Sequence, residues 1–255
     1  KIRNTFRFIL GNIKDNFQKQ SLESINIKKF NELEQFILHK LFVLDKSVKE
    51  NLKNYNFHKL YKELSNFCTS DLSSFYFDIR KDVLYCDSLN SKKRKDCIIV
   101  LNIILDCLLN WFAPIFVFTT EEIYSLVNKE NKSIHENSFI KIPKKWENNV
   151  LDNKWKQLFK IKQEANISIE EKRASKEIGS SLEAELKITT NDKIFKLLEG
   201  LDLAEYFITS KAKKIKGKEE LKIEVVKTKG TKCPRCWKIL DSKCSRCEDV
   251  IQESV

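Results

Sequence analysis

Apolar residues in the first half of the chain recur at spacings of three and four, which is the period of an amphipathic helix. The first such run predicts a helix with Arg3 and Arg7 on its polar side. Its apolar side consists of Ile2, Phe6, Ile9, Ile13 and Phe17. A second helix is predicted over 31–54, and this length suits a helical bundle.

The helical period continues toward the middle of the chain. A third helix is predicted over 60–79 and a fourth over 91–111. Pro114 must end or kink the fourth helix, because proline lacks an amide donor and clashes with the preceding turn. Thr119 and Glu122 have the spacing of a capping box and predict the start of a short further helix.

The period changes in the second half of the chain. A connecting helix is predicted over 152–175, and after Glu183 apolar and polar residues alternate, as they do in β-strands. The alternating apolar positions are Ala184, Leu186 and Ile188 in one run and Leu221, Ile223 and Val225 in another. These runs predict a small mixed α/β unit after the helices.

Four cysteines near the C-terminal end have the spacing C-x2-C-x7-C-x2-C, and they are Cys233, Cys236, Cys244 and Cys247. Each C-x-x-C pair forms a tight turn that directs two thiolates at one tetrahedral centre. We expect one structural zinc ion per chain, which helps to fold a segment with few apolar residues. Two disulfides, a redox-active pair and iron–sulfur ligation are the alternatives.

The predicted fold class is therefore mainly α, with a helical bundle followed by a small α/β unit and a four-cysteine zinc knuckle. We divide the chain into a bundle domain (1–149), a connecting helix with a small α/β junction domain (150–208), and a basic loop with a zinc-binding module (209–255).

Composition and charge refine this picture. The chain has 255 residues, 42% of them hydrophobic, and no run near the roughly 20 apolar residues that span a bilayer. We expect a soluble monomer without membrane contact. Because the chain begins at Lys1 and contains no methionine, we expect it to be part of a longer protein. The other four cysteines occur singly, which is typical of buried free thiols in a reducing cytoplasm.

The formal charge is +11, and residues 209–247 hold 13 Lys and Arg against 4 Asp and Glu, which gives 13 − 4 = +9. Such an excess favours a polyanionic partner, although a solvated Lys-rich surface is the alternative. The densest cluster is a predicted loop with Lys211, Lys213, Lys214, Lys216 and Lys218. Lysines of this kind contact a phosphate backbone without choosing a sequence.

Arg235 and Trp237 belong to the first zinc knuckle and form a pair that can bind RNA. An aromatic ring stacks on an unpaired base, and arginine bridges phosphates or stacks beside it. Packing of Trp237 against a neighbouring domain is the alternative. A search for catalytic groups is negative: the three histidines are far apart, and no Gly-rich phosphate loop occurs.

Several segments resemble the C-terminal part of bacterial-type isoleucyl-tRNA synthetases of class I. These are KIRNTFRFILGN (1–12), LYCD (84–87), WFAPI (111–115), FTTEEI (118–123), KEIGSSLEA (176–184), KCPRCWK (232–238) and CSRC (244–247). They cover the chain from end to end and occur in the family's order. The first, fifth and later motifs favour the isoleucyl enzyme over the valyl and leucyl enzymes, which remain an alternative.

The resemblance implies that the bundle is an anticodon-binding domain and that the partner is the tRNA for isoleucine. We name as candidate tRNA contacts Arg235, Trp237, Lys238, Arg246, Lys211, Lys213, Lys214, Arg3 and Arg7. The family's adenylate-forming and editing domains have no counterpart in this sequence, so we expect ATP binding and catalysis only in upstream domains of the parent enzyme. A helical scaffold whose zinc tail contacts only protein, and a redox-active thiol protein, are the competing functions.

Overall fold

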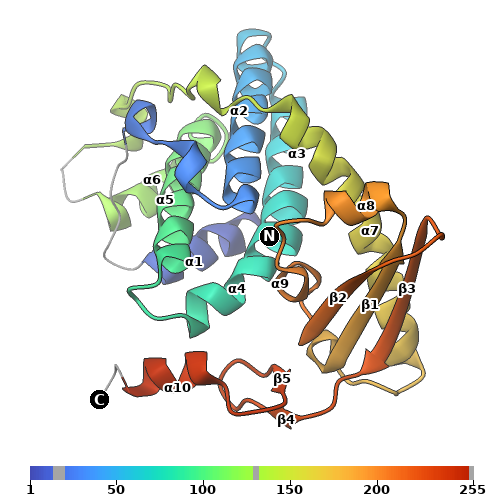
Figure 1. Cartoon of the computed structure of the whole chain (residues 1–255). Helices are drawn as coiled ribbons and strands as arrows, with labels where there is room; N and C mark the ends of the chain where they lie inside the picture. Colours follow the sequence, from blue (N-terminus) through green and yellow to red (C-terminus); the bar gives the residue numbers. More distant parts are fainter. Residues whose placement is uncertain (14–20, 129–131, 253–255) are drawn as a thin grey trace. The chain divides into compact units, whose positions relative to one another are not determined.

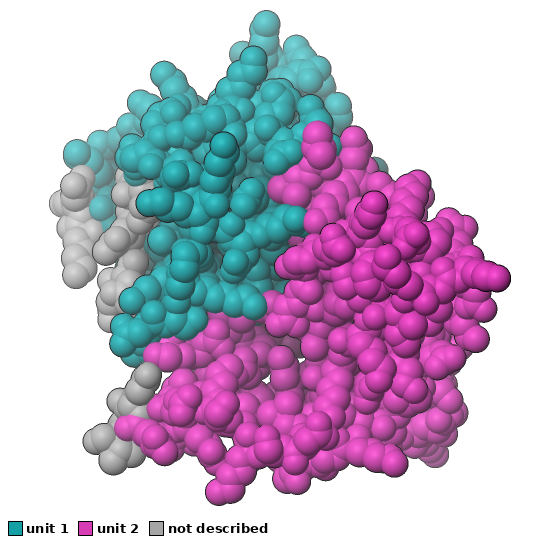
Figure 2. All heavy atoms as spheres, viewed as in Figure 1, with its two compact units in different colours: residues 1–80, 89–149 teal, residues 81–88, 150–255 magenta. Residues whose placement is uncertain are grey.

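The computed structural model describes residues 1–13, 21–128 and 132–252. It divides into two compact units, coloured separately in Figure 2. Unit 1 consists of Lys1–Arg80 and Leu89–Asn149, and unit 2 of Lys81–Ser88 and Val150–Val255. In the described part of the chain, no helix has both the length and the apolar character needed to cross a bilayer.

Unit 1 is built from helices, as the periodicity predicts (Figure 1). The long helices that begin in it are α1 (Ile2–Ile13), α2 (Glu32–Lys53), α3 (Phe57–Asn66), α4 (Phe77–Cys86), α5 (Lys92–Phe112) and α6 (Val117–Val127). The 3-10 turns are η1 (Leu22–Ser24), η2 (Ile27–Lys29), η4 (Ile134–Glu136) and η5 (Lys144–Trp146). Phe17, predicted on the face of the first helix, lies outside the described residues.

Helix α5 forms the centre of unit 1. Ser91 caps its start by accepting a hydrogen bond from the Arg94 amide, and almost every side chain from Val100 to Phe112 is buried. A helix that is apolar on all sides must be enclosed by other elements. Helices α1, α2 and α6 contact α5 and provide this enclosure.

A π-helix joins α3 to α4. It is η3 (Phe67–Tyr76), which continues the helical run that the sequence predicts over 60–79. The Ser73 and Ser74 hydroxyls donate to carbonyls five residues earlier, with O···O distances of 2.8 and 2.9 Å. The periodicity identifies the run as helical but does not distinguish this wider turn from an α-helix.

The capping box predicted at Thr119 and Glu122 is wrong. Helix α6 begins at Val117, because the Thr120 amide already donates to the Phe116 carbonyl at 2.9 Å. Thr119 and Glu122 therefore lie inside the helix. Glu122 instead forms an exposed ion pair with Arg3 of α1.

A fully buried ion pair lies among the described residues of unit 1. The Arg80 guanidinium donates to both carboxylate oxygens of Glu34, at 2.6 and 2.7 Å, and both side chains are at most 3% exposed. The Tyr76 hydroxyl and the Cys97 thiol donate to the same carboxylate at 3.2 and 3.6 Å. The charge of Glu34 is thus balanced by several donors inside the bundle.

Unit 2 is a mixed α/β unit, as predicted. Its helices and 3-10 turn are α7 (Asn149–Ala174, from its second residue on), η6 (Ser181–Glu183), α8 (Asp192–Leu197), α9 (Leu203–Phe207) and α10 (Ser245–Gln252). Its strands are β1 (Ala184–Thr190), β2 (Lys211–Lys216), β3 (Leu221–Lys227), β4 (Thr231–Lys232) and β5 (Ile239–Leu240). The first three strands form one sheet in the order β2-β1-β3, and β4 and β5 form a separate hairpin.

The central strand β1 confirms the alternation seen in the sequence. Ala184, Leu186, Ile188 and Thr190 are buried, and the residues between them are partly exposed. Helices α8 and α9 contact the sheet, and Tyr206 of α9 packs edge-to-face on Trp155 of α7, with ring centroids 5.6 Å apart. The apolar face of α7 therefore belongs to the core of this unit.

The prediction of a loop for the lysine cluster is wrong for Lys211–Lys216, because these residues form strand β2. It pairs in parallel with β1, and β3 pairs with the other edge of β1 in antiparallel register. The segment lacks an alternating apolar pattern, so its strand conformation depends on backbone pairing with β1. One sheet therefore includes strands from both sides of the boundary drawn at residue 208.

Candidate functional site

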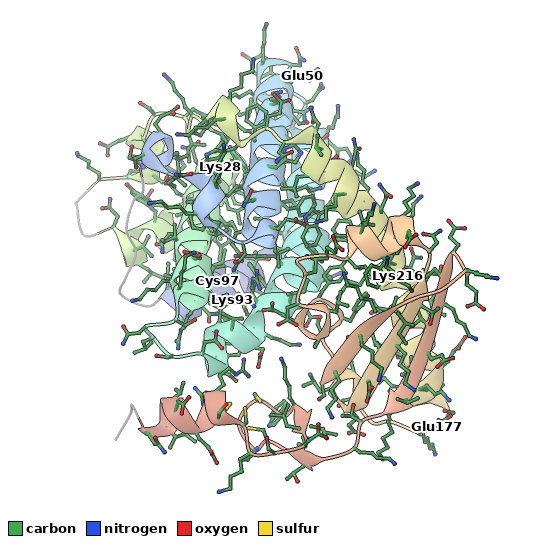
Figure 3. All side chains as sticks on the ribbon, viewed as in Figure 1. Lys28, Glu50, Lys93, Cys97, Glu177 and Lys216 are labelled. Carbon is green, nitrogen blue, oxygen red and sulfur yellow. The ribbon has the colours of Figure 1, made fainter. Side chains whose placement is uncertain are left out.

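The four cysteines predicted as zinc ligands lie together at the β4–β5 hairpin and the start of α10. All pairs among their sulfur atoms lie within 4.8 Å, and the yellow sulfur atoms converge there in Figure 3. The Cys236 and Cys244 sulfurs are 3.9 Å apart. A tetrahedral centre of one zinc and four sulfurs, with bonds of about 2.3 Å, has sulfur atoms roughly 3.8 Å apart. The arrangement therefore fits a zinc ion with four thiolate ligands.

Backbone hydrogen bonds shape the two knuckles. The Cys233 amide donates to the Lys238 carbonyl at 2.9 Å, and the Trp237 amide donates to the Cys233 carbonyl at 3.0 Å. Trp237 has a φ of 65°, in the left-handed region that large side chains rarely adopt. Before the first knuckle, Gly230 has a φ of 130°, and a Cβ atom there would lie 2.2 Å from the Leu240 carbonyl oxygen. Glycine is therefore required where the hairpin strands meet.

One thiol of the cluster, Cys233, differs from the other cysteines in its readiness to ionise, whereas burial raises the pKa of Cys236 and Cys247. Burial disfavours the Cys233 thiolate, but hydrogen bonds from the Cys236 and Arg235 amides outweigh it and lower the pKa of Cys233 to about 7. Burial raises the pKa of Cys68 to about 12 and that of Cys86 to about 11. A thiol that ionises near neutral pH is prepared to bind a metal, whereas the buried single thiols remain protonated.

All eight cysteines are described, and none forms a disulfide. The four single cysteines are buried, as predicted for free thiols. Within the described residues, the four-cysteine cluster is the one group of His, Cys, Asp or Glu side chains close enough to hold a metal. His39, by contrast, is buried and accepts a hydrogen bond from the Asn148 amide at 3.0 Å, which is a packing role.

Arg235 binds the end of helix α4. Its guanidinium donates to the Tyr85 carbonyl at 3.1 Å and to the Cys86 carbonyl. The last carbonyls of a helix have no partner within the helix, and a cation at that end also interacts favourably with the helix dipole. Arg235 therefore serves as a C-terminal cap for a helix whose Tyr85 lies 150 residues earlier in the sequence.

Arg246 and Lys238 bind the same segment through its carboxylates. The Arg246 guanidinium donates to both oxygens of Asp82, at 2.7 and 3.0 Å, and to Asp87 at 3.1 Å. The Lys238 ammonium lies 3.6 Å from Asp82. Burial opposes ionisation of Asp82, but the Arg246 hydrogen bonds and the Lys238 charge outweigh it and lower the pKa of Asp82. No sequence pattern identifies Asp82 and Asp87 as partners of the zinc module.

Trp237 projects from the first knuckle into solvent. It is 61% exposed, and the Lys232 ammonium lies 5.9 Å from the ring centroid. The tryptophan is therefore not deeply buried within the zinc module. An exposed ring beside a cation has the two features that single-stranded RNA contacts use, namely a stacking face and a charge for phosphate.

The β2 lysines have acidic or aromatic neighbours within unit 2. The Lys211 ammonium donates to Asp241 at 2.7 Å, and the Lys213 ammonium lies 3.1 Å from Glu185. The Lys214 ammonium lies 4.2 Å from the centre of the Phe195 ring. These contacts reduce the positive electrostatic potential that the lysine-rich sequence suggests for this segment. Lys213 nevertheless keeps 55% of its side chain exposed.

The two remaining candidates, Arg3 and Arg7, lie on α1 in unit 1, and both are exposed. The zinc-cluster and β2 candidates all lie in unit 2. The structure thus brings together the metal ligands with Arg235, Trp237, Lys238 and Arg246.

Comparison with known proteins identifies the helical part of the chain. A family model described as the anticodon-binding domain of tRNA ligase matches residues 34–188, which is more than half of the chain. The chain belongs to this family. The match runs from α2 into strand β1, so this anticodon-binding domain includes most of the bundle, the connecting helix and the first strand.

Relatives of this chain are named isoleucine–tRNA ligase. The chain is 56% identical to the one from Pelagibacter ubique over 250 residues, covering 98% of the chain and 28% of that protein. It is 36% identical to the protein of that name from Agrobacterium fabrum, covering 94% of the chain and 26% of the relative. The resemblance to isoleucyl-tRNA synthetases is confirmed, and the chain spans about a quarter of the length of these relatives.

Proposed function

We propose that this chain recognises the anticodon stem-loop of an isoleucine tRNA, as part of an isoleucine–tRNA ligase. The match of residues 34–188 to the anticodon-binding family carries the proposal. The 56% identity to a protein named isoleucine–tRNA ligase supports isoleucine as the amino acid. In this proposal the parent enzyme acts in the cytoplasm as a monomer. Its other domains bind ATP, attach isoleucine and edit errors, so we expect no aminoacylation by this chain alone.

One zinc ion held by Cys233, Cys236, Cys244 and Cys247 has a structural role in this proposal. These four thiolates would hold the ion, which would crosslink the hairpin and α10 in a segment whose apolar core is small. Arg235, Lys238 and Arg246 then attach this module to residues 81–88. Their main effect on tRNA binding would be to position the module, and direct contacts by these residues remain predictions.

Trp237 is the side chain of the zinc module that best fits direct RNA contact. Its exposed ring can stack on an unpaired base, and Lys232 can pair with an adjacent phosphate. Contacts by Lys211, Lys213, Lys214, Arg3 and Arg7 are non-specific in this proposal and serve the phosphate backbone.

Filter binding over a range of salt concentrations tests the proposal. The chain should bind isoleucine tRNA more tightly than another tRNA, and the affinity should fall steeply as salt rises. Trp237→Ala should weaken binding by roughly 5-fold or more, because a stacked base contributes about 1–3 kcal/mol. Ile251→Ala, an exposed apolar position on α10 of the same unit, is the matched control and should change little.

Equal affinity for the two tRNAs at every salt concentration would contradict tRNA recognition and favour the protein-contacting scaffold. Unchanged binding by Trp237→Ala with a full zinc content would remove that residue from the RNA interface.

A further inference from the structure

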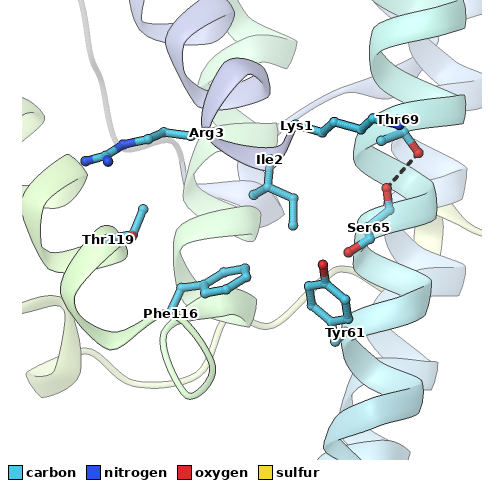
Figure 4. A pocket seen from close by; sticks show the side chains of 8 residues that line it. All are labelled: Lys1, Ile2, Arg3, Tyr61, Ser65, Thr69, Phe116 and Thr119. Atoms are coloured by element: carbon cyan, nitrogen blue, oxygen red, sulfur yellow. Dashed lines mark hydrogen bonds between the residues drawn. The ribbon is translucent and has the colours of Figure 1, made fainter.

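Unit 1 contains a pocket of about 380 Å³ between α1, the start of α6 and the α3–η3 run (Figure 4). Its walls include Arg3, Tyr61, Ser65, Thr69 and Phe116. The volume lies in the range of about 300–1,000 Å³ that is typical of small-ligand sites. All lining residues belong to unit 1, and none takes part in the zinc module.

The pocket combines aromatic and aliphatic walls with a positive rim. Tyr61 and Phe116 meet edge-to-face with ring centroids 6.0 Å apart, and Tyr61 keeps 43% of its surface exposed. In an edge-to-face pair, at least one ring keeps a face that its partner does not cover. Arg3 lies at the rim, paired with Glu122 in an ion pair whose side chains are 61% and 58% exposed. An exposed ion pair of this kind contributes little to stability. A phosphate can therefore replace Glu122 as the partner of Arg3 at a small cost in free energy.

Ser65 adds an unused polar group to the wall. Its hydroxyl oxygen is buried and has no hydrogen-bond partner among the described residues. Its backbone carbonyl, in contrast, accepts a hydrogen bond from the Thr69 hydroxyl at 2.9 Å, drawn as a dashed line in Figure 4. A buried polar atom without a partner costs free energy, so a ligand toward which the Ser65 hydroxyl rotates gains affinity by supplying that partner.

The backbone beneath the pocket is also unusual. Thr69 lies in the π-helix η3, one helical turn beyond Ser65 at the end of α3. A π-helical segment is less stable than an α-helix and occurs often at functional sites. The π-helix η3 and the unpaired Ser65 hydroxyl therefore belong to the same wall of the pocket.

We propose that this pocket receives one unpaired nucleobase of the bound RNA. The inference rests on the proposed function, which supplies a single-stranded loop with bases free to leave their stack. A planar base can stack on Tyr61 or Phe116 while its edge bonds the Ser65 hydroxyl, and its phosphate can pair with Arg3. In this arrangement the aromatic walls contact the face of the base, the Ser65 hydroxyl contacts its edge, and Arg3 contacts its phosphate.

The test uses the 255-residue chain, a transcript of isoleucine tRNA and three variants. Tyr61→Ala should weaken binding by roughly 5- to 100-fold, the loss that removal of one base-stacking ring produces. Phe57→Ala is the matched control, because Phe57 lies one turn earlier on α3, is equally exposed at 43% and does not line the pocket. It should bind within about twofold of the unchanged chain, the scatter expected for an energetically neutral contact.

Ser65→Ala provides a variant whose fold is not at risk. Since the Ser65 hydroxyl has no partner in the described part of the unbound chain, its removal should leave the unfolding midpoint unchanged or higher. RNA binding should fall by roughly 2- to 10-fold if the base edge uses this hydroxyl. Photocrosslinking of RNA with 4-thiouridine in the anticodon loop, followed by peptide mapping, should label the α3–η3 or α6 segments around the pocket.

The results separate this proposal from the one on which it rests. If the unchanged chain prefers isoleucine tRNA but Tyr61→Ala and Ser65→Ala bind as Phe57→Ala does, the pocket proposal is overturned and anticodon recognition stands. If the unchanged chain shows no preference among tRNAs, anticodon recognition fails. A crosslink from a base to the pocket segments in that case would still support a base site, whereas its absence would overturn both proposals.

Discussion

At the residue scale, the arginines and the tryptophan around the zinc cluster have two different uses. Arg235 and Arg246 are half-buried and donate to groups of residues 81–88, whereas Trp237 projects into solvent from a backbone turn with positive φ. From the sequence, all three are candidate tRNA contacts. Their hydrogen-bond partners instead indicate that the arginines hold the module and the tryptophan is displayed by it.

Arg246→Met tests this division of roles. The change should remove the Arg246 hydrogen bonds to Asp82 and Asp87 and lower the stability of the docked module by about 1–3 kcal/mol, as expected for hydrogen bonds to charged groups. Hydrogen exchange of amides in α10 and in residues 82–87 should become faster, while the zinc content stays at one per chain. Lys243→Met is the control, since Lys243 is 88% exposed. Equal exchange in the two variants would show that Arg246 does not hold the module.

The buried Glu34–Arg80 pair gives a second prediction at this scale. Arg80→Met should lower the free energy of unfolding by about 3–5 kcal/mol, because it leaves the Glu34 carboxylate buried without its cation. Arg3→Met removes one member of an exposed pair and should cost less than about 1 kcal/mol. Urea unfolding followed by circular dichroism measures both. A similar small loss for the two variants would contradict the assigned cost of the buried charge.

At the scale of elements, the sequence predicts most helices but not every boundary. The apolar residues of α2 and α5 predict the positions of these helices closely. One face of α2 and almost the whole surface of α5 are buried, so that both segments have a clear apolar pattern. Strand β2 is not predicted, because its sequence KAKKIK has no alternating apolar pattern. Its strand conformation depends on pairing with β1. The zinc ligands follow from local spacing, whereas their docking to Asp82 joins residues 164 apart and leaves no local pattern.

Loss of zinc should unfold only the zinc-binding module and leave the helices of unit 1 folded. Removal of the ion by a chelator, or the change Cys244→Ser, should unfold the β4–β5 hairpin and α10 and expose residues 81–88, because these contacts depend on the knuckles. Helices α1 to α3, α5 and α6 should keep their far-ultraviolet dichroism, since their core is separate.

Cys86→Ser is the control for this experiment. Cys86 is buried beside the cluster but is not among the four thiols that can share a metal. The variant should keep one zinc per chain by elemental analysis. Loss of the whole helical signal on chelation would show that unit 1 depends on the metal.

At the scale of the whole molecule, two candidate RNA contacts stand on separate units: Trp237 on unit 2 and the Tyr61 pocket on unit 1. Membership in the anticodon-binding family gives both the same expected ligand, a loop of unpaired bases. The remaining lysines add a salt-dependent attraction that does not distinguish one tRNA from another. Selectivity in this account therefore depends on the loop bases and not on the net charge of +11.

The most direct test is competition between two RNA stem-loops for the 255-residue chain. One carries the anticodon loop of isoleucine tRNA, and the other has the same stem and length but substituted anticodon bases. At moderate salt, the first should displace labelled isoleucine tRNA at a concentration at least about tenfold lower, because each correctly stacked base contributes about 1–3 kcal/mol. Equal displacement by the two stem-loops would contradict anticodon recognition by this chain.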